Sequence, residues 1–349
     1  MYNDKTVAVV IPAYNEEAFI AGVVETVPDF VDRVYPVDDC STDGTWAAIQ
    51  GAAERVNDAG LDRDSPFEDR VVPIQHAENR GVGGAIKTGY LRAREDAIDV
   101  TAVMGGDGQM RPEALELIVE PVATGRADYA KGNRLLDEQF HEDMPRFRYV
   151  GNRILTLLTK IASGYWNVGD PQNGYTAISL EALERVEIEE MYEFYGYCND
   201  LLVKLNVAGM RVVDVPRQAV YDDEESHIDY RTYIPKVSGM LARNALWRVW
   251  AKYVVSERHP VALLAGVAAL AGVAGVGSLL KRITGFGDGA SRLGTLATLF
   301  GTAVFAILAI DREHDDHLDG QTEWKPEPDS VEQSMVEEAD QRTQIRHRD

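Results

Sequence analysis

The chain is poor in cysteine and in basic charge. It has only two cysteines, Cys40 and Cys198, which lie far apart and match no spacing of metal-ligating cysteines. We therefore expect two reduced, partly buried thiols rather than a disulfide or a cysteine-metal site. Lysine and arginine number 35 against 57 aspartate and glutamate residues, for a formal net charge of -22. This shortage of basic residues argues against a nucleic-acid partner, because binding a phosphate backbone requires them.

The acidic residues are dispersed along the chain, as in the segments 58–69, 222–225 and 311–319. A dispersed acidic surface keeps a protein soluble, and concentrated salt screens its self-repulsion to a range of about 3 Å at molar ionic strength. We therefore expect an extremely halophilic source.

The chain begins with Met1–Lys5 and turns at once into an apolar strand pattern. A secretory signal would continue as a longer apolar segment, so we expect none. The amino-terminal part is therefore expected to stay in the cytoplasm. The length of 349 residues leaves room for one large domain with an appendage or for two domains.

Two apolar runs without a charge lie near the carboxyl end, at 261–280 and 293–310. Each is long enough to cross the hydrocarbon core of a bilayer, which is about 30 Å thick. We expect a transmembrane hairpin after a juxtamembrane linker at 246–260; the alternative is a pair of buried helices in a soluble protein. The charged segment 311–349 is expected to be a largely disordered tail, because it has few aromatic residues.

Basic residues flank the first apolar run. Arg243, Arg248, Lys252 and Arg258 precede it, whereas Lys281, Arg282 and Arg292 occupy the connection to the second run. The first group favours a cytoplasmic start by the positive-inside rule, and the second group weakens that bias. We expect a multi-pass protein of the cell membrane with its amino-terminal domain on the cytoplasmic side.

Polar residues follow three apolar runs that have the character of buried strands. The run from Val7 to Ile11 leads to Pro12, Tyr14, Asn15 and Glu16; the run from Val34 to Val37 leads to Asp38 and Asp39; and the run from Val100 to Met104 leads to Asp107 and Gln109. In an open α/β sheet, ligands bind at the carboxyl ends of the strands. These residues are therefore expected to line one crevice.

A glycine-rich segment, Asn79–Gly89, lies between the second and third of these strand ends. In this order, the segments resemble family 2 glycosyltransferases, and most of all the branch that charges dolichyl or polyprenyl phosphate with one sugar. The resemblance covers about residues 5–245, which gives an expected glycosyltransferase domain at 1–245. It implies an α/β fold of the A type, a Rossmann-like mixed sheet flanked by helices, that binds a nucleotide diphosphate sugar with Mg2+ or Mn2+.

The resemblance assigns the nucleotide to residues of the first two strand ends and the glycine-rich turn. In the family, the first loop holds the base and ribose of the nucleotide. One of the two acids, here at 38 and 39, typically hydrogen-bonds the base or the ribose. The residues are Pro12, Tyr14, Asn15, Glu16, Asp38, Asp39, Gly83 and Lys87. Alternatives remain open: Asn15 is also a good helix N-cap, Ser41 and Asp43 would cap the helix expected from Thr45, and Lys87 would be an exposed helix charge.

The family holds its divalent cation with an Asp-x-Asp-x-Gln run, to which Asp107 and Gln109 correspond. Oxygen ligands of this kind suit Mg2+ or Mn2+. Here Gly105 replaces the first acid of the run. The retained Asp107 is therefore the expected metal ligand, and a degenerate, non-catalytic relative stays an alternative.

The resemblance also implies three residues on the acceptor side of the crevice, Arg134, Arg148 and Asp170. The first two correspond best to the phosphate-binding arginines of the lipid-phosphate branch, and Asp170 opens the Asp-x-Gln-x-Gly-aromatic element. The helix expected from Pro145 to Ile161 is amphipathic, so its arginines have the alternative role of attracting anionic lipid. Asp170–Tyr175 is alternatively an ordinary turn.

The loop at 221–227 takes the place of the family's mobile lid. Its Asp222, Asp223, Glu224 and Glu225 replace the usual arginine and glycine. An acidic loop repels a diphosphate, so we assign it no phosphate-clamping role.

The expected reaction is inverting transfer of one hexosyl unit from a nucleotide diphosphate sugar to dolichyl or polyprenyl phosphate, to supply or start lipid-linked sugars for protein glycosylation. Asp107, Arg134, Arg148 and Asp170 are its expected catalytic residues. The alternatives are elongation of a lipid-linked or polymeric glycan, and a membrane-tethered nucleotide-sugar binder without catalysis. Against elongation, the chain lacks the Gln-x-x-Arg-Trp element of processive synthases.

Overall fold

The computed structural model describes residues 1–60, 66–134, 146–216, 230–256, 259–283 and 290–320. Its centre is a seven-stranded sheet in the order β3-β2-β1-β4-β6-β5-β7. The strands are β1 (Val7–Ala13), β2 (Arg33–Asp38), β3 (Ile74–Gln75), β4 (Val100–Val103), β5 (Tyr129–Asn133), β6 (Thr176–Ser179) and β7 (Val212–Pro216).

Six of the strands point in one direction. β1 pairs in parallel with β2 and β4, and β2 pairs in parallel with β3. β6 runs antiparallel to both β4 and β5, while β7 runs parallel to β5. The carboxyl ends of β1, β2, β4, β5 and β7 therefore meet at one edge of the sheet, where β6 begins.

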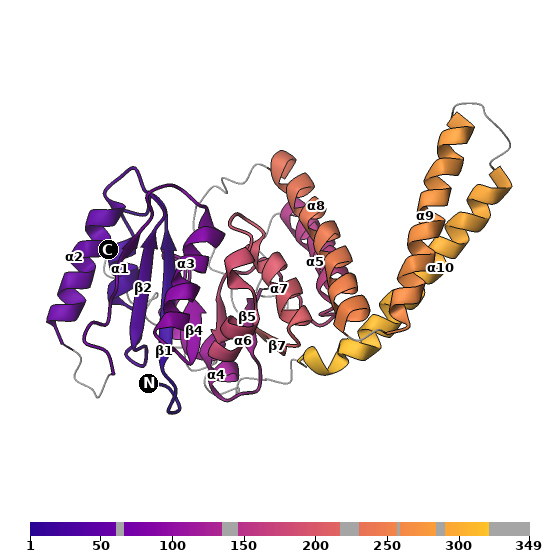
Figure 1. Cartoon of the computed structure of the whole chain (residues 1–349). Coiled ribbons are helices and arrows are strands. Elements are labelled where there is room, and N and C mark those ends of the chain that lie inside the picture. The colour runs from indigo at the N-terminus through magenta and orange to yellow at the C-terminus, as the bar shows by residue number, and fades with distance from the viewer. Residues whose placement is uncertain (61–65, 135–145, 217–229, 257–258, 284–289, 321–349) are drawn as a thin grey trace, which may run out of the picture.

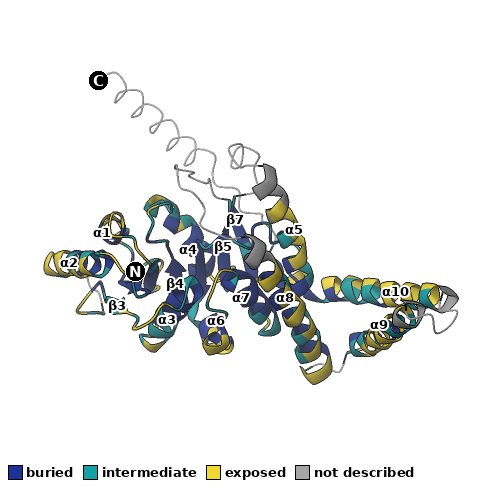
Figure 2. Ribbon diagram, turned by 90° about the horizontal axis from the view of Figure 1, so that it is seen from above, coloured by how far each residue is buried: buried dark blue, intermediate teal, exposed yellow. Residues whose placement is uncertain are grey.

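Helices cover both faces of this sheet (Figures 1 and 2). On one face, Val7, Val9 and Ile11 of β1 pack with α1, α2 and α4; on the other, Ala8 and Val10 pack with α3, α6 and α7. The alternation follows from the two-residue period of a strand. The helices are α1 (Ile20–Glu25), α2 (Thr45–Asp58), α3 (Val82–Glu95), α4 (Leu115–Ala123), α6 (Leu180–Arg185) and α7 (Tyr197–Val207).

The expected α/β fold of the A type, a mixed sheet flanked by helices, is confirmed. The sequence predicted the strands at 7–11, 34–37 and 100–104 to within two residues, and α2 begins at Thr45 as expected. α7 begins at Tyr197, directly after Gly196, which adopts a left-handed conformation with φ 111°, and a 3-10 turn at Ile188–Glu190 precedes it.

The described residues from 230 to 318 are mostly helical. α5 (Arg146–Ser163) packs against α8 (Tyr230–Val249), which continues into a π-helical segment, Trp250–Ser256. The residues expected as a linker at 246–260 are thus mostly helical. α9 (Val261–Ile283) and α10 (Ala290–Asp315) form a hairpin that projects from the body in both views (Figures 1 and 2).

Both hairpin helices are long and apolar enough to cross a membrane. Few side chains of their apolar stretches are buried, unlike those of the core helices of a soluble protein. The disordered tail was expected from residue 311, but the first residues of that segment are ordered. α10 continues through Asp311 to Asp315, and a 3-10 turn follows at Asp316–Leu318. Asp311, Asp315 and Asp319 are buried, which excludes a disordered segment before residue 320.

Candidate active site

The loops after β1 and β2 are tied to each other by hydrogen bonds. The Asn15 backbone N–H donates to Ser41 Oγ at 3.0 Å, and the Thr42 N–H donates to Asn15 Oδ1 at 2.8 Å. Asn15 has a φ of 59°, a conformation that asparagine tolerates better than most residues. The alternative that Asn15 caps a helix is wrong, because α1 begins only at Ile20 and Asn15 joins two loops instead.

Other residues of the first loop lie at the same place. The Glu16 N–H donates to Thr45 Oγ1 at 2.7 Å, and the Pro12 carbonyl accepts a bond of 3.2 Å from the Gly106 N–H. Tyr14 is an exposed aromatic residue with 47% of its surface accessible. This loop therefore contacts both neighbouring strand ends and leaves an aromatic ring open to a ligand.

The predicted helix caps behave differently from each other. Asp43 Oδ1 accepts the N–H of Thr45, the first residue of α2, at 3.0 Å. Hydrogen bonding by Thr45 lowers the pKa of Asp43. Ser41 accepts from Asn15 and does not cap the helix.

Asp38 and Asp39 are both buried at the end of β2. Asp38 accepts from the Ser41 N–H at 3.2 Å and from Gln75 Nε2 at 3.0 Å. Asp39 Oδ1 accepts from the Arg80 N–H at 2.8 Å and lies 2.7 Å from His76 Nδ1. Both carboxylates are thus fixed before any ligand arrives.

His76 is a residue that the sequence did not single out. Its ring lies between Asp39 and Thr88, whose Oγ1 is 2.9 Å from Nε2. Its position directly after the two-residue strand β3 was the only available signal. The contact of its Nδ1 with Asp39 Oδ1 helps to fix the orientation of that carboxylate.

The glycine-rich turn packs against protein backbone. A Cβ on Gly83 would lie 2.5 Å from the Tyr192 carbonyl oxygen, and the Gly84 N–H donates to the Glu193 carbonyl at 2.8 Å. Glycine at 81 and 83 is therefore required by the neighbouring 192–194 segment, because a Cβ on Gly81 would lie 2.7 Å from the Phe194 ring. Contact of Gly83 with a nucleotide stays a prediction.

Lys87 is buried, with 7% of its surface exposed, so the alternative of an exposed helix charge is wrong. Its ammonium donates to the Glu189 carbonyl at 3.0 Å and lies 2.5 Å from Glu193 Oε1. Arg80 lies at the same distance from that oxygen. Lys87 thus anchors α3 to the 189–193 segment, and its predicted contact with phosphate would have to break this pairing.

Asp107 and Gln109 lie in the turn after β4. Asp107 Oδ1 accepts the Gln109 N–H at 3.0 Å. A Cβ on Gly105 would lie only 2.9 Å from the same oxygen, so the Asp107 carboxylate takes the space of the absent acidic side chain. In the described part of the chain, no three His, Cys, Asp or Glu side chains converge as a metal group. A metal here would need the donor's phosphates as further ligands.

Arg134 and Asp170 form a two-pronged ion pair. Nε donates to Oδ2 at 2.7 Å and Nη2 to Oδ1 at 3.2 Å. Asp170 is buried, whereas Arg134 retains partial exposure. Burial opposes ionisation, but Arg134, followed by Lys131, outweighs it and holds the pKa of Asp170 below its usual range.

A second layer of polar residues supports this pair. The fully buried Lys131 donates to the Asp170 carbonyl and lies 3.9 Å from Asp214. Asp214 Oδ2 also accepts from Asn133 Nδ2 and from the Gly169 N–H, both at 2.5 Å. Burial raises the pKa of Asp214 despite Lys131. The sequence did not single out Lys131 or Asp214, because a lone charge inside a strand pattern carries no positional signal.

The strand directions bring the first-loop residues, Asp38, Asp39, Asp107 and Arg134 to one edge of the sheet, with Asp170 just before β6. Gly83 and Lys87 lie on α3 beside them. Arg148 belongs to α5, but its side chain and the acidic loop 221–227 lie outside the described residues. The edge therefore offers carboxylates and an amide on one side, and a fixed guanidinium on the other.

Comparisons with known proteins identify relatives of this chain. The chain is 29% identical over 221 residues to the UDP-N-acetylglucosamine–dolichyl-phosphate N-acetylglucosaminyltransferase of Methanococcus voltae, covering 63% of this chain and 88% of that protein. It is also 29% identical over 216 residues to the undecaprenyl-phosphate mannosyltransferase of Micrococcus luteus, covering 60% and 82%.

A solved structure, the glucosyl-3-phosphoglycerate synthase of Mycobacterium tuberculosis in complex with Mn2+, UDP and phosphoglyceric acid, aligns with a TM-score of 0.49 and 19% identity over 70% of this chain and 78% of that one. Residues 8–187, more than half of the 349, match the model of the family described as Glycosyl transferase family 2. The chain belongs to glycosyltransferase family 2.

Proposed function

We propose that this glycosyltransferase transfers one hexosyl unit, with inversion, from a nucleotide diphosphate sugar to dolichyl or polyprenyl phosphate at the cytoplasmic face of a membrane, and so supplies or starts lipid-linked sugars for protein glycosylation. The observation that carries the proposal is the Arg134–Asp170 pair. It holds a guanidinium at the same sheet edge as Asp39 and Asp107.

A fixed guanidinium suits a phosphate acceptor. Arginine stays charged and donates two parallel hydrogen bonds, which match phosphate oxygens. A phosphate monoester has a second pKa of about 6, so at neutral pH it attacks without a strong base. The Asp170 carboxylate is engaged by Arg134 through both oxygens, which supports an orienting role rather than proton abstraction. Arg148 would add a second cation toward the same phosphate.

The donor would bind to the loops after β1, β2 and β4. The fixed carboxylates of Asp38 and Asp39 accept hydrogen bonds from a base or ribose, and the open ring of Tyr14 supplies an apolar surface. Asp107 and Gln109 have the oxygen donors that Mg2+ or Mn2+ requires, and they would hold the ion. A bound ion neutralises the charge that develops on the leaving diphosphate.

The membrane supplies the lipid acceptor. α9 and α10 have the length and apolarity of membrane spans, and α5 exposes Ile154, Leu157 and Leu158. Both relatives named above act on a polyprenyl-type phosphate according to their names. Nucleotide sugars are cytoplasmic, which supports that side for the catalytic domain.

Sugar transfer by washed membranes that contain the full chain tests the proposal. Labelled UDP-glucose, GDP-mannose and UDP-N-acetylglucosamine would be supplied in turn, with dolichyl phosphate, Mg2+ or Mn2+ and high salt. We expect one donor to give a product that extracts into organic solvent and is split by mild acid. If a nucleotide sugar binds and no lipid product forms, the proposed reaction is wrong, and elongation of a glycan or a non-catalytic binder with Gly105 as the leading suspect takes its place.

A further inference from the structure

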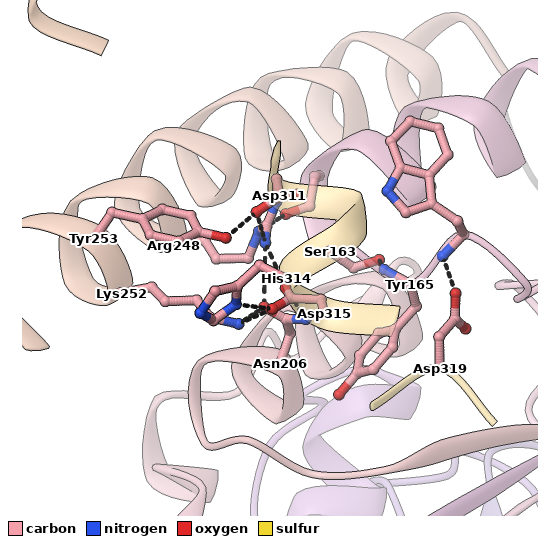
Figure 3. Close-up of polar contacts among 12 residues, drawn as sticks. Ser163, Tyr165, Asn206, Arg248, Lys252, Tyr253, Asp311, His314, Asp315 and Asp319 are labelled. Atoms are coloured by element: carbon pink, nitrogen blue, oxygen red, sulfur yellow. Dashed lines mark hydrogen bonds and ion pairs between the residues drawn. The ribbon is translucent and has the colours of Figure 1, made fainter. Parts of the chain in front are cut away.

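The carboxyl-terminal end of α10 returns to the catalytic body through a buried cluster of charges (Figure 3). Arg248 of α8 donates to both oxygens of Asp311, at 2.8 and 2.7 Å, and lies 3.3 Å from Asp315. Lys252 pairs with Asp315. The Tyr253 hydroxyl donates to Asp311 at 2.6 Å. Two cations of the α8 segment thus balance two anions of α10.

This cluster joins the hairpin to the core of the enzyme. Arg248, Asp311 and Asp315 are at most 2% exposed. Asn206 of α7 also donates to Asp315, at 2.9 Å. Removing one partner of a buried pair leaves an uncompensated charge, so the cluster ties α10 to α7 and α8.

The cluster lies against the beginning of the loop 164–170. Gly164 has a φ of 81°, and a Cβ there would lie 2.6 Å from Arg248 Nη1. Arg248 Nε also donates to the carbonyl of Ala162 at 2.8 Å. The guanidinium therefore contacts both the last turn of α5 and the loop that follows it.

Asp319 holds the next residues of this loop. Its Oδ2 accepts the backbone N–H groups of Trp166 and Asn167, at 2.5 and 2.7 Å. The next residue, Gly320, donates its N–H to the Val212 carbonyl of β7 at 2.8 Å. Asp319 is 6% exposed, so little water competes for these bonds.

The far end of the same loop carries the acceptor side of the candidate site. The Gly169 N–H donates to Asp214, and Asp170 receives the two bonds of Arg134. Only Val168 separates the residues held by Asp319 from those that support Arg134. A shift of Asn167 is therefore passed on to Asp170 over a few backbone bonds.

We propose that the end of the hairpin is a part of the active site, in which Asp319 is a positioning residue that sets the Asp170–Arg134 pair through the loop 164–170. The function assigned to that pair rests on the proposed reaction, but the mechanical coupling does not. The catalytic domain is incomplete without residues 311–320, and the placement of the hairpin in a membrane influences the acceptor subsite.

The test compares three full-length variants in phospholipid nanodiscs: Asp319→Ala, Asp319→Asn and Asp316→Ala. Asparagine keeps a carbonyl oxygen that accepts both N–H groups, and Asp316 is an exposed carboxylate on the same turn that serves as the matched control. Hydrogen exchange would be followed in the peptides that cover 164–170 and 129–134. The KM for polyprenyl phosphate and the dissociation constant of UDP would be measured beside it.

In Asp319→Ala, we expect exchange to rise about tenfold in both peptides, the factor that corresponds to about 1.4 kcal/mol. The KM for the lipid should rise by a similar factor while UDP binding stays constant, and the other two variants should match the wild type. Faster exchange in 164–170 alone, with unchanged KM, would reduce Asp319 to a loop cap and overturn the proposal, as would unchanged exchange.

If the wild type transfers no sugar from any donor, the proposed reaction falls. The exchange of 129–134 then still decides whether Asp319 reaches Arg134.

Discussion

Arg134 approaches Asp170 side-on, with Nε 2.7 Å from one carboxylate oxygen and Nη2 3.2 Å from the other. The carboxylate is buried and the guanidinium is partly exposed. The pair therefore aims a cation of fixed orientation outward from the sheet edge. Under the proposed reaction, this geometry would let the same aspartate orient an acceptor without accepting its proton.

Replacing Arg134 with lysine should weaken use of the lipid phosphate. An ammonium cannot donate two parallel bonds to Asp170 and still face a phosphate with a planar group. We expect the KM for polyprenyl phosphate to rise about tenfold, equivalent to about 1.4 kcal/mol, with UDP binding unchanged. Arg126→Lys, at an exposed arginine after α4, is the control. A KM equal to that of the wild type would remove Arg134 from the acceptor subsite.

Gly83→Ala should destabilise the protein. The added Cβ would lie 2.5 Å from the Tyr192 carbonyl oxygen, which belongs to the backbone and cannot rotate away. Overpacking of this kind costs about 1–3 kcal/mol. Gly22→Ala in α1 meets no atom within 4 Å and should stabilise by about 0.5–1 kcal/mol. Denaturant unfolding of the two variants would show opposite shifts; equal shifts would contradict the close contact.

Arg248→Met should lower the stability by about 3–5 kcal/mol, because it leaves Asp311 and Asp315 buried without their main cation. Arg243→Met, on the exposed face of the same helix, should change it by less than about 0.5 kcal/mol. Thermal unfolding in detergent would measure both. Similar effects of the two substitutions would show that the cluster does not hold the hairpin end.

The stability contributed by Asp319 should depend on pH. Burial, with a further effect of Asp214, raises its pKa to about 6 from an ordinary 3.8, although the Asn167 and Trp166 N–H groups and Lys160 oppose the rise. The folded state therefore binds the proton more tightly than the unfolded state, so this contribution falls as pH increases through the window from 3.8 to about 6.

Asp319→Asn should remove that dependence. Its melting temperature should exceed that of the wild type at pH 7, and the difference should shrink toward pH 4. Asp316→Asn should show no such trend. A constant difference between Asp319→Asn and the wild type across these pH values would contradict the raised pKa.

Gly105→Asp would restore the acid that the metal run lacks. Because a Cβ at this position lies 2.9 Å from Asp107 Oδ1, the two carboxylates would stand side by side. Their repulsion is relieved by a divalent cation, so we expect the Mn2+ concentration for half-maximal transfer to fall about tenfold, or about 1.4 kcal/mol. Gly105→Asn controls for size. An equal effect of asparagine and aspartate would show that charge does not limit metal binding.

Local sequence patterns predicted the strand ends well. Apolar runs followed by polar residues located the ends of β1, β2 and β4, since burial of a parallel strand demands a continuous apolar segment. They also located the two apolar helices of the hairpin. The halophilic source rests on dispersed charge alone and stays a prediction.

Pairings over long sequence separations could not be predicted in the same way. Lys87 had the sequence context of an exposed helix charge, yet it is buried against Glu189 and Glu193 on another element. Asp311 and Asp319 looked like members of a solvated acidic tail, yet each has partners far away in the sequence. The same local sequence is compatible with a solvated charge and with a buried one. Which of the two occurs depends on whether the fold brings an ion-pair or hydrogen-bond partner to that charge.

The sequence by itself determined the order of the strands along the chain, the polar residues at their ends and the apolar hairpin, because these follow from burial and backbone periodicity within a few residues. Only the tertiary structure decided that Asp170 holds Arg134. It also decided that Asp319, at the end of the hairpin, holds the loop 164–170 that leads to Asp170. A buried carboxylate is stable only beside donors that neutralise it, and those donors are brought to it by the packing of the whole chain.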